Sequence, residues 1–197
     1  MPIITDISPP VERAARWTLG QYEELIDAGV LDRRRVELIA GQITEMSPAS
    51  SPHDACISIT AEWLRERLGR RFLVREEKGI ALPSTTSLPE PDLVICARRS
   101  DHYRSAKPTT REIRLVIEVA VSSLNYDREV KAPLYAASGI PEYWIVNLID
   151  RQLERYLPGG EGVYTDPAIL AADAAFSHDL YGSVAVADLL PGVSHEH

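Results

Sequence analysis

The order of hydrophobic and polar residues along the chain predicts a mixture of strands and helices. Two near-continuous apolar runs, at 92–96 and 113–119, are typical of strands buried on both faces of a sheet. Such burial requires helices on either side of that sheet. A further pair of runs, at 143–148 and 152–157, is separated by a short turn and predicts a hairpin, and a shorter strand is expected at 72–74.

Helical patterns lie between these strands. Thr18 and Gln21 have the spacing of a capping box, which predicts a helix beginning there. Ser51, followed by a proline at the first helical position, is expected to cap a second helix that ends at Gly69. A third helix is expected to begin at Asp127 as its cap.

A second hairpin precedes the long helix, with strands at 35–39 and 42–46. The resulting order is helix, hairpin, helix, three strands, helix and hairpin, so we expect a mixed sheet between helices. The length of 197 residues and a hydrophobic content of 45% fit one domain. We therefore expect a single domain over 1–197, with a core of about 17–190 and tails at 1–16 and 191–197.

The composition argues against a secreted, metal-stapled or membrane protein. Cys56 and Cys96 lie far apart, without a C-x-x-C pair or a histidine at ligand spacing. No apolar run approaches the roughly 20 residues that a membrane helix needs, and the first residues lack a signal-peptide pattern. We expect a cytoplasmic protein with no membrane partner.

The net charge of -8 argues against a nucleic-acid partner, but its distribution weakens that argument. Residues 158–197 hold six acids and no Lys or Arg, whereas 98–114 hold six basic residues against two acids. A second basic group lies within 65–75. These runs can be a solvated helix face and loop, or they can contact phosphates. The phosphate contacts expected in the loop are Arg104, Lys107 and Arg111.

Two acids interrupt the apolar pattern of the interior strands. Asp92 heads one strand after a proline, and Glu118 lies inside the other. A buried carboxylate needs a counter-charge, a hydrogen-bond network or a cation. Lys131 borders the apolar face of the following helix, so it is either a snorkelling surface lysine or a cation delivered to the two acids. The second arrangement suits phosphodiester chemistry, in which carboxylates hold Mg²⁺ and a lysine offsets transition-state charge.

Pro91-Asp92 followed by Glu118 on the next strand resembles the PD-(D/E)xK nuclease pattern. An ordered set of further motifs extends the likeness over roughly residues 17 to 190 and resembles the Uma2 family of putative restriction endonucleases. The matching segments are Val36-Glu37-Leu38-Ile39-Ala40-Gly41, Met46-Ser47-Pro48, His53, Pro91-Asp92-Leu93-Val94, Glu118-Val119 with Ser122-Ser123, and Gly139-Ile140-Pro141-Glu142-Tyr143-Trp144-Ile145-Val146.

The resemblance implies an α/β fold, with a restriction-endonuclease-like central mixed β-sheet flanked by helices and with additional β-hairpins. One departure concerns the catalytic lysine. The superfamily places it two residues after the second acid, where this chain has Ala120. The resemblance implies that the lysine has moved to the next helix as Lys131, where related nucleases carry a Gln-x-x-x-Tyr motif and this chain has Lys131-x-x-x-Tyr135.

The remaining site residues follow in part from the resemblance. It implies that Glu37 helps to hold the metal or its water, although Glu37 can also be a strand-surface acid beside three arginines. We expect Mg²⁺, with Mn²⁺ as a substitute, on Asp92 and Glu118, with the backbone carbonyl of Val119 as a third ligand. Side chains that can contact the substrate or support the site are His53, Tyr126, Asp127 and Tyr135.

Three hypotheses remain open from the sequence. The first is a metal-dependent DNA endonuclease, which can be a homodimer because a two-fold axis matches duplex symmetry. The second is a catalytically inactive module that keeps the fold and binds DNA or a protein partner, which Ala120 and the acidic C-terminal region favour. The third is a metal-dependent hydrolase of another phosphorylated substrate.

Overall fold

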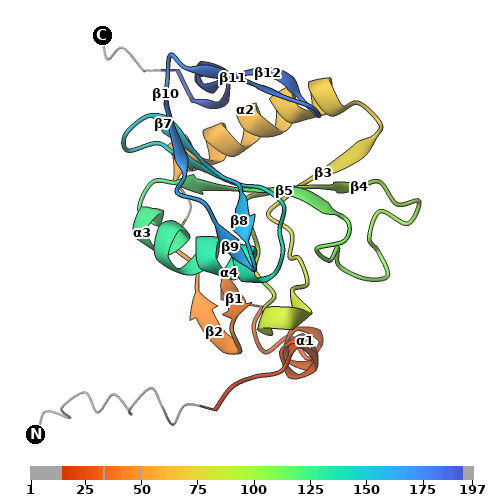
Figure 1. Cartoon of the computed structure of the whole chain (residues 1–197). Helices are drawn as coiled ribbons and strands as arrows, with labels where there is room; N and C mark the ends of the chain where they lie inside the picture. The colour runs from red at the N-terminus through yellow and green to blue at the C-terminus, as the bar shows by residue number, and fades with distance from the viewer. Residues whose placement is uncertain (1–14, 33, 49, 193–197) are drawn as a thin grey trace, which may run out of the picture.

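A mixed six-stranded sheet forms the middle layer of the protein (Figure 1). The computed structural model describes residues 15–32, 34–48 and 50–192. Only β5 and β6 run parallel, and every other neighbouring pair in this sheet is antiparallel. In spatial order the strands are β10 (Ala168–Ala171), β7 (Gln152–Tyr156), β6 (Tyr143–Asn147), β5 (Ile113–Ala120), β4 (Leu93–Ala97) and β3 (Phe72–Glu76).

Different elements cover the two faces of the sheet (Figure 1). One face packs against the long helix α2 (Ser51–Leu68) and the hairpin of β11 (Ala175–His178) and β12 (Gly182–Ala185). The other face packs against a continuous helical segment made of α3 (Leu124–Tyr126), a π-helical turn (Asp127–Lys131) and α4 (Ala132–Ala137). The smaller elements are α1 (Leu19–Asp27), the hairpin of β1 (Val36–Ile39) and β2 (Gln42–Glu45), the hairpin of β8 (Pro158–Gly160) and β9 (Val163–Tyr164), and 3₁₀ turns at Pro83–Thr85 and Val186–Leu189.

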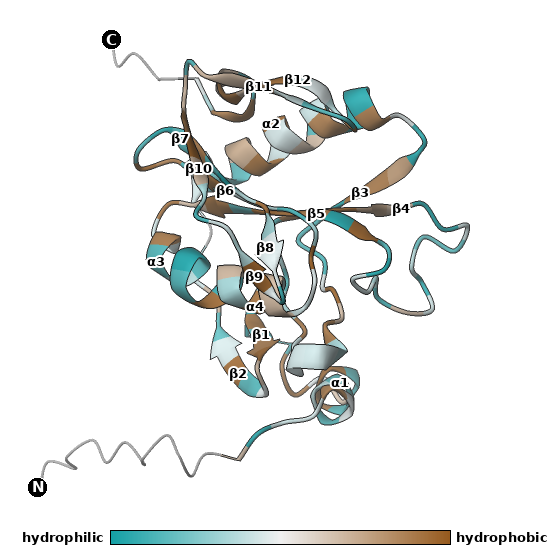
Figure 2. Ribbon diagram, viewed as in Figure 1, coloured by the Kyte–Doolittle hydropathy of each residue, from teal (hydrophilic) through white to brown (hydrophobic). Residues whose placement is uncertain are grey.

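Alternate residues of β5 enter two separate hydrophobic cores. Leu115 and Ile117 pack on the α2 side, whereas Val116 and Ala120 pack on the α4 side. Because side chains alternate along a strand, Glu118 belongs to the α4 side. The hydropathy colouring shows β4 and much of β1 as brown, with teal on the surface loops (Figure 2). The interior position of β4 and β5 therefore explains their continuous apolar runs.

The fold expected from the sequence is confirmed: a mixed sheet lies between helices and carries additional hairpins. The capping box at Thr18 is also confirmed, with Gln21 as its reciprocal partner. Ser51 is not the cap of α2, because Ser50 precedes the first helical residue in extended conformation. Asp127 is not a helix cap either, since the helical segment already begins at Leu124 and Asp127 lies inside it.

The sequence analysis missed the strands after residue 157. β10 adds an edge strand to the main sheet, and the β11–β12 hairpin covers part of the α2 side. The expected tails at 1–16 and 191–197 fall largely outside the described residues. In the described part of the chain, no helix combines the length and the apolar composition needed to cross a membrane.

Candidate active site

The antiparallel pairing of β4 with β5 brings Asp92 and Glu118 together. Leu93 pairs with Ile117, so the residue before β4 lies beside the end of β5. The Asp92 Oδ2 atom accepts a 2.7 Å hydrogen bond from the backbone N–H of Val119. The backbone N–H of Asp92 in turn donates to Glu118 Oε2 at 3.4 Å. The two carboxylates predicted from adjacent strands therefore share one corner of the sheet.

Lys131 reaches this corner from the π-helical turn. Its Nζ atom lies 2.9 Å from Glu118 Oε1 and 3.5 Å from Glu37 Oε2. The residue is only 5% exposed, so the alternative of a snorkelling surface lysine is wrong. Lys131 is thus a buried ammonium group placed between two carboxylates from different elements.

Glu37 enters from the β1–β2 hairpin. It is 1% exposed, so it is not a strand-surface acid. The Tyr126 hydroxyl lies 3.3 Å from Glu37 Oε1, and the backbone N–H of Glu90 donates to Oε2 at 3.3 Å. Tyr135, four residues after Lys131, donates its hydroxyl to Glu118 Oε1 at 2.8 Å. The two tyrosines therefore hold the two carboxylates that flank Lys131.

His53 lies in the first turn of α2, between two carboxylates. Its Nε2 atom is 3.2 Å from Asp92 Oδ1, and its Nδ1 atom is 3.3 Å from Asp54 Oδ1. The hydrogen bond with Asp92 is the main cause that raises the pKa of His53 to about 9, despite partial burial. Because both ring nitrogens face acceptors, the ring is a doubly protonated imidazolium at neutral pH.

Asp127 lies inside the π-helical turn and lines the same cleft. Its carboxylate accepts a 2.6 Å hydrogen bond from the Ser123 hydroxyl. Burial raises the pKa of Asp127 to about 6, and the nearby Lys131 opposes that shift. The sequence analysis placed this residue at a helix start, whereas the structure makes it a buried acid of the site.

The carboxylates of the site outnumber its cations. Burial raises the pKa of Glu118 well above its usual range, and the attraction of Lys131 only partly opposes this. Burial alone would lower the pKa of Lys131, but Glu118, Glu37 and Asp127 raise it above its usual range. Five acids, namely Asp92, Glu45 and these three, therefore line a cleft of about 320 Å³ together with Lys131, His53 and Arg35. The cleft favours an added positive charge.

The donor chemistry of the cleft fits a hard divalent cation, because carboxylate oxygens are the ligands that Mg²⁺ prefers. As the side chains stand, no three His, Cys, Asp or Glu residues in the described ranges converge into a group that could hold a metal ion. The oxygens of Asp92 and Glu118 are instead taken by the Val119 N–H, His53, Lys131 and Tyr135. A bound cation would therefore compete with protein donors for these oxygens.

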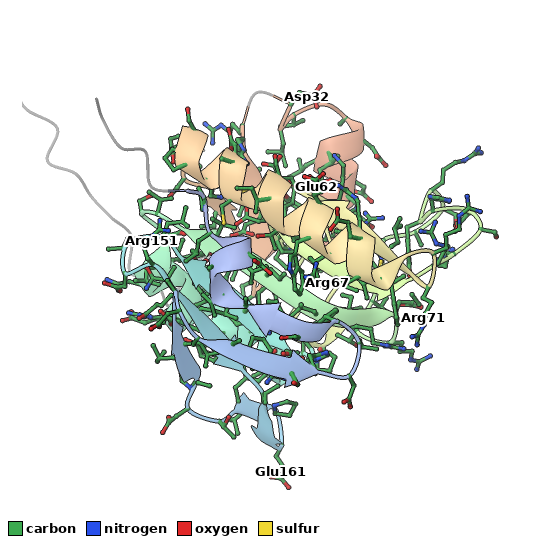
Figure 3. All side chains as sticks on the ribbon, turned by 90° about the horizontal axis from the view of Figure 1, so that it is seen from above. Asp32, Glu62, Arg67, Arg71, Arg151 and Glu161 are labelled. Carbon is green, nitrogen blue, oxygen red and sulfur yellow. The ribbon has the colours of Figure 1, made fainter. Side chains whose placement is uncertain are left out.

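The basic loop expected to contact phosphates lies at the other end of the sheet. The loop follows the last residue of β4, whereas Asp92 directly precedes its first residue. The five residues of β4 span about 16 Å, which separates the start of the loop from Asp92. Arg71 reaches the same end because β3 begins beside the end of β4, and side-chain nitrogens gather where Arg71 is labelled (Figure 3). Lys107 is different, because the loop turns back there: it packs against Gly79, lies close enough to Glu90 to oppose the rise in its pKa that burial causes, and pairs with Glu23 at 3.3 Å. No residue of the loop lines the cleft, and its phosphate contacts stay a prediction.

Glu90 is a residue of this region that the sequence analysis missed. It is half-buried two residues before Asp92, and burial together with Glu37 raises its pKa. Its position between two prolines was the only sequence signal, since a Pro-x-Pro segment has no helical or strand period. Its closeness to Glu37 depends on the β1–β2 hairpin, which the local sequence does not place.

Comparisons with known proteins agree with this architecture. A crystal structure from Anabaena variabilis, described as a putative nuclease belonging to DUF820, is similar with a TM-score of 0.64 and 14% identity. The match covers 78% of this chain and 88% of that one. No curated protein matches the chain significantly. A family model described as "Putative restriction endonuclease" matches residues 19–187. The sequence motifs, the sheet that positions them and this match together show that the chain belongs to the Uma2 family of putative restriction endonucleases.

Proposed function

We propose that the protein is a nuclease that hydrolyses phosphodiester bonds of DNA, with Mg²⁺ as its metal and Mn²⁺ as a substitute. The family description and the description of the similar solved structure support a nuclease. The observation that carries the proposal is Lys131, buried between Glu118 and Glu37 in the cleft that also contains Asp92. An ammonium group beside a surplus of carboxylates suits the handling of a phosphate anion and a cation together.

Asp92 and Glu118 are the side chains that would hold the cation, with the backbone carbonyl of Val119 as a third ligand. Val119 lines the cleft and its N–H already points at Asp92. In an extended strand, the N–H and C=O of one residue point to the same edge. A bound Mg²⁺ would polarise a phosphoryl oxygen and lower the pKa of a bound water.

The protein side chains account for the charges and protons of hydrolysis. The water oxygen bonds to phosphorus while the bond from phosphorus to one ester oxygen breaks. Lys131 would offset the negative charge that develops on the phosphoryl oxygens. Glu37, 3.5 Å from Lys131, would accept the proton that the water loses. The imidazolium of His53, 3.2 Å from Asp92, can contact a phosphate oxygen, and the leaving ester oxygen takes up a proton from this imidazolium or from solvent.

Nicking of supercoiled plasmid DNA tests this proposal directly. The wild-type protein is expected to nick with Mg²⁺ or Mn²⁺ and to stop when a chelator is added. Asp92→Asn and Glu118→Gln should each abolish nicking and weaken Mn²⁺ binding in calorimetry. Glu129→Gln is the matched control, because Glu129 is exposed in the same helical segment and does not line the cleft. Unchanged Mn²⁺ affinity in both site variants would contradict the assigned metal ligands.

A binding module without catalysis is the second candidate, and Ala120 favours it. The position where the superfamily carries its lysine is fully buried in the α4-side core. Lys131 nevertheless reaches Glu118 at 2.9 Å, so a lysine ammonium is present at the second acid. DNA binding without metal-dependent nicking of any tested substrate would support the binding module. Cleavage of a phosphomonoester or another phosphorylated compound, but not of DNA, would support the third hypothesis.

The basic end of the sheet would hold the DNA away from the cut. Arg104 and Arg111 are exposed and form no ion pair among the described residues, and Arg70 and Arg71 reach the same end from α2. Arginines free of acids are suited to contact phosphates. A homodimer that presents two clefts to the two strands of a duplex remains part of the proposal, and analytical ultracentrifugation with and without DNA tests it.

A further inference from the structure

The strand register places a second buried carboxylate in one row with Glu118. Glu118 on β5 pairs with Ile145 on β6, and Ile145 pairs with Glu154 on β7. Paired residues point to the same face, so both carboxylates face the helical segment that carries Lys131. Neighbouring strands are about 4.8 Å apart, which separates the two positions by roughly 10 Å.

Arg128, three residues before Lys131, binds this second carboxylate. Its Nε atom donates to Glu154 Oε2 at 2.9 Å, and its Nη2 atom donates to Oε1, so the contact is bidentate. Glu154 is fully buried and also accepts from Asn147 Nδ2 at 3.0 Å. Burial would raise the pKa of Glu154, but these donors outweigh it and lower the pKa, so Glu154 is ionised at neutral pH.

The helical segment therefore docks across the sheet through two cations. Lys131 contacts β5 at Glu118, and Arg128 contacts β7 at Glu154, with the apolar Ile145 between them. A bidentate guanidinium–carboxylate contact restricts rotation as well as distance. The two contacts together determine both the rotation of the segment about its axis and its position along the row.

The π-helical turn lets the same segment keep its other residues in the cleft. In an α-helix of 3.6 residues per turn, residues four apart are offset by about 40°, so Asp127 and Tyr135 would be about 80° apart. The wider i→i+5 turn over Asp127–Lys131 offsets this drift. Asp127, Lys131 and Tyr135 can thus all be buried on the sheet side while Arg128 turns toward β7.

We propose that Arg128 and Glu154 are positioning residues that hold Lys131 in the cleft through the π-helical turn. This inference rests on the proposed function only in so far as Lys131 assists cleavage. The contact serves stability as well as orientation, because the Arg128 side chain is 37% exposed but Glu154 is fully buried and would be left as an unpaired charge without Arg128.

The test removes both partners, so that no unpaired charge stays buried. Arg128→Met with Glu154→Gln is expected to lower kcat by about 10- to 100-fold, because small misplacements of a catalytic group have effects of this size. KM for DNA should change by less than about twofold. The matched control is Arg155→Met with Glu142→Gln, an equivalent pair on the opposite face of the sheet. The control should keep kcat within about twofold of wild type.

A second readout does not require any cleavage. The chain has three lysines, Lys78, Lys107 and Lys131, so acetic anhydride labelling can be assigned by mass spectrometry. Lys131 should be protected in the wild type and in the control, and labelled faster in the Arg128/Glu154 variant, with exposed Lys78 as the internal reference. In a Lys131→Met background, loss of the Arg128/Glu154 pair should lower kcat no further.

The two readouts separate the inference from the proposed function. Faster labelling of Lys131 in a protein that cuts no DNA would support the positioning role and contradict the nuclease. Unchanged labelling and unchanged kcat in a protein that does cut DNA would overturn the positioning role and leave the nuclease in place. A reduction in kcat that is fully additive with Lys131→Met would also overturn it, because the pair would then act independently of the lysine.

Discussion

Two buried carboxylates on opposite faces of the same sheet, Glu118 and Glu142, have different surroundings. Glu142 is 6% exposed and accepts from Trp144 Nε1 at 2.6 Å and from Arg155 Nε at 2.7 Å. Its other oxygen lies 2.8 Å from His178 Nε2. In the described part of the chain, these three donors bind no second carboxylate. Both oxygens of Glu142 thus have protein partners that no other carboxylate shares, and we call Glu142 the saturated acid.

Glu118 is buried to a similar degree, at 3% exposure, but it shares its cation. Lys131 also contacts Glu37, and Asp92 lies beside Glu118 at the mouth of a cleft. The comparison shows that a buried charge pair alone does not indicate a functional site. A surplus of negative charge that faces an open cleft does indicate a functional site, because a positively charged ligand can neutralise it.

The largest expected effect concerns the shared cation. Lys131→Met should lower the cleavage rate by on the order of 10²- to 10³-fold, because it removes a preorganised positive charge from the reacting phosphate. Plasmid nicking under multiple-turnover conditions measures the decrease, and circular dichroism checks the fold. Lys131→Arg restores activity if charge is what matters, whereas inactivity of both variants indicates that the compact ammonium geometry is needed. Full activity in both would remove Lys131 from the mechanism.

The saturated acid should respond in stability and not in cleavage. Glu142→Gln is expected to destabilise the protein by about 2 to 3 kcal/mol, because hydrogen bonds to a charged group are worth that much and Arg155 loses its counter-charge. Urea unfolding measures the change. Nicking by the folded variant should stay close to wild type, and a rate decrease like that of Glu118→Gln would break the comparison.

An acid in surplus should respond with the opposite sign. Burial raises the pKa of Asp127 from 3.8 to about 6, so its folded form favours the protonated acid. The preference of the folded protein for protonated Asp127 contributes to the free energy of unfolding. This contribution is fully present below pH 3.8 and is lost as the pH rises through about 6. Asp127→Asn should therefore stabilise the protein by roughly 1 to 2 kcal/mol at pH 8 and have little effect near pH 4. The midpoints of urea unfolding at the two pH values measure this effect. Destabilisation by Asp127→Asn at pH 8 would contradict an excess of negative charge in the cleft.

The smallest effect belongs to the basic end of the sheet. Replacing Arg104, Lys107 and Arg111 with Gln should flatten the plot of log K for duplex binding against log salt, by about 0.9 for each phosphate that the protein no longer neutralises. The cleavage rate at saturating DNA should not change, because none of the three residues lines the cleft. Arg151→Gln is the control, since Arg151 binds the Pro191 carbonyl at 3.2 Å in the turn between β6 and β7. An unchanged slope would remove these residues from the DNA path.

The sequence alone predicted the elements whose signals are local. The apolar runs of β4 and β5, the β6–β7 hairpin and the capping box of α1 depend on neighbouring residues, and all were confirmed. The polar interruptions at Asp92 and Glu118 indicated a site for the same reason, since a carboxylate in an apolar run needs a partner wherever the strand lies. The identity of that partner stayed open.

Only the tertiary structure decided the relations between distant segments. It placed Lys131 and Glu37 at Glu118, put Glu154 two strands away in the same row, and moved the basic loop to the far end of the sheet. It also saturated Glu142 while leaving Glu118 to share its cation. The physical reason is that charge balance and reach depend on strand order, register and the π-helical turn, which result from packing over the whole chain.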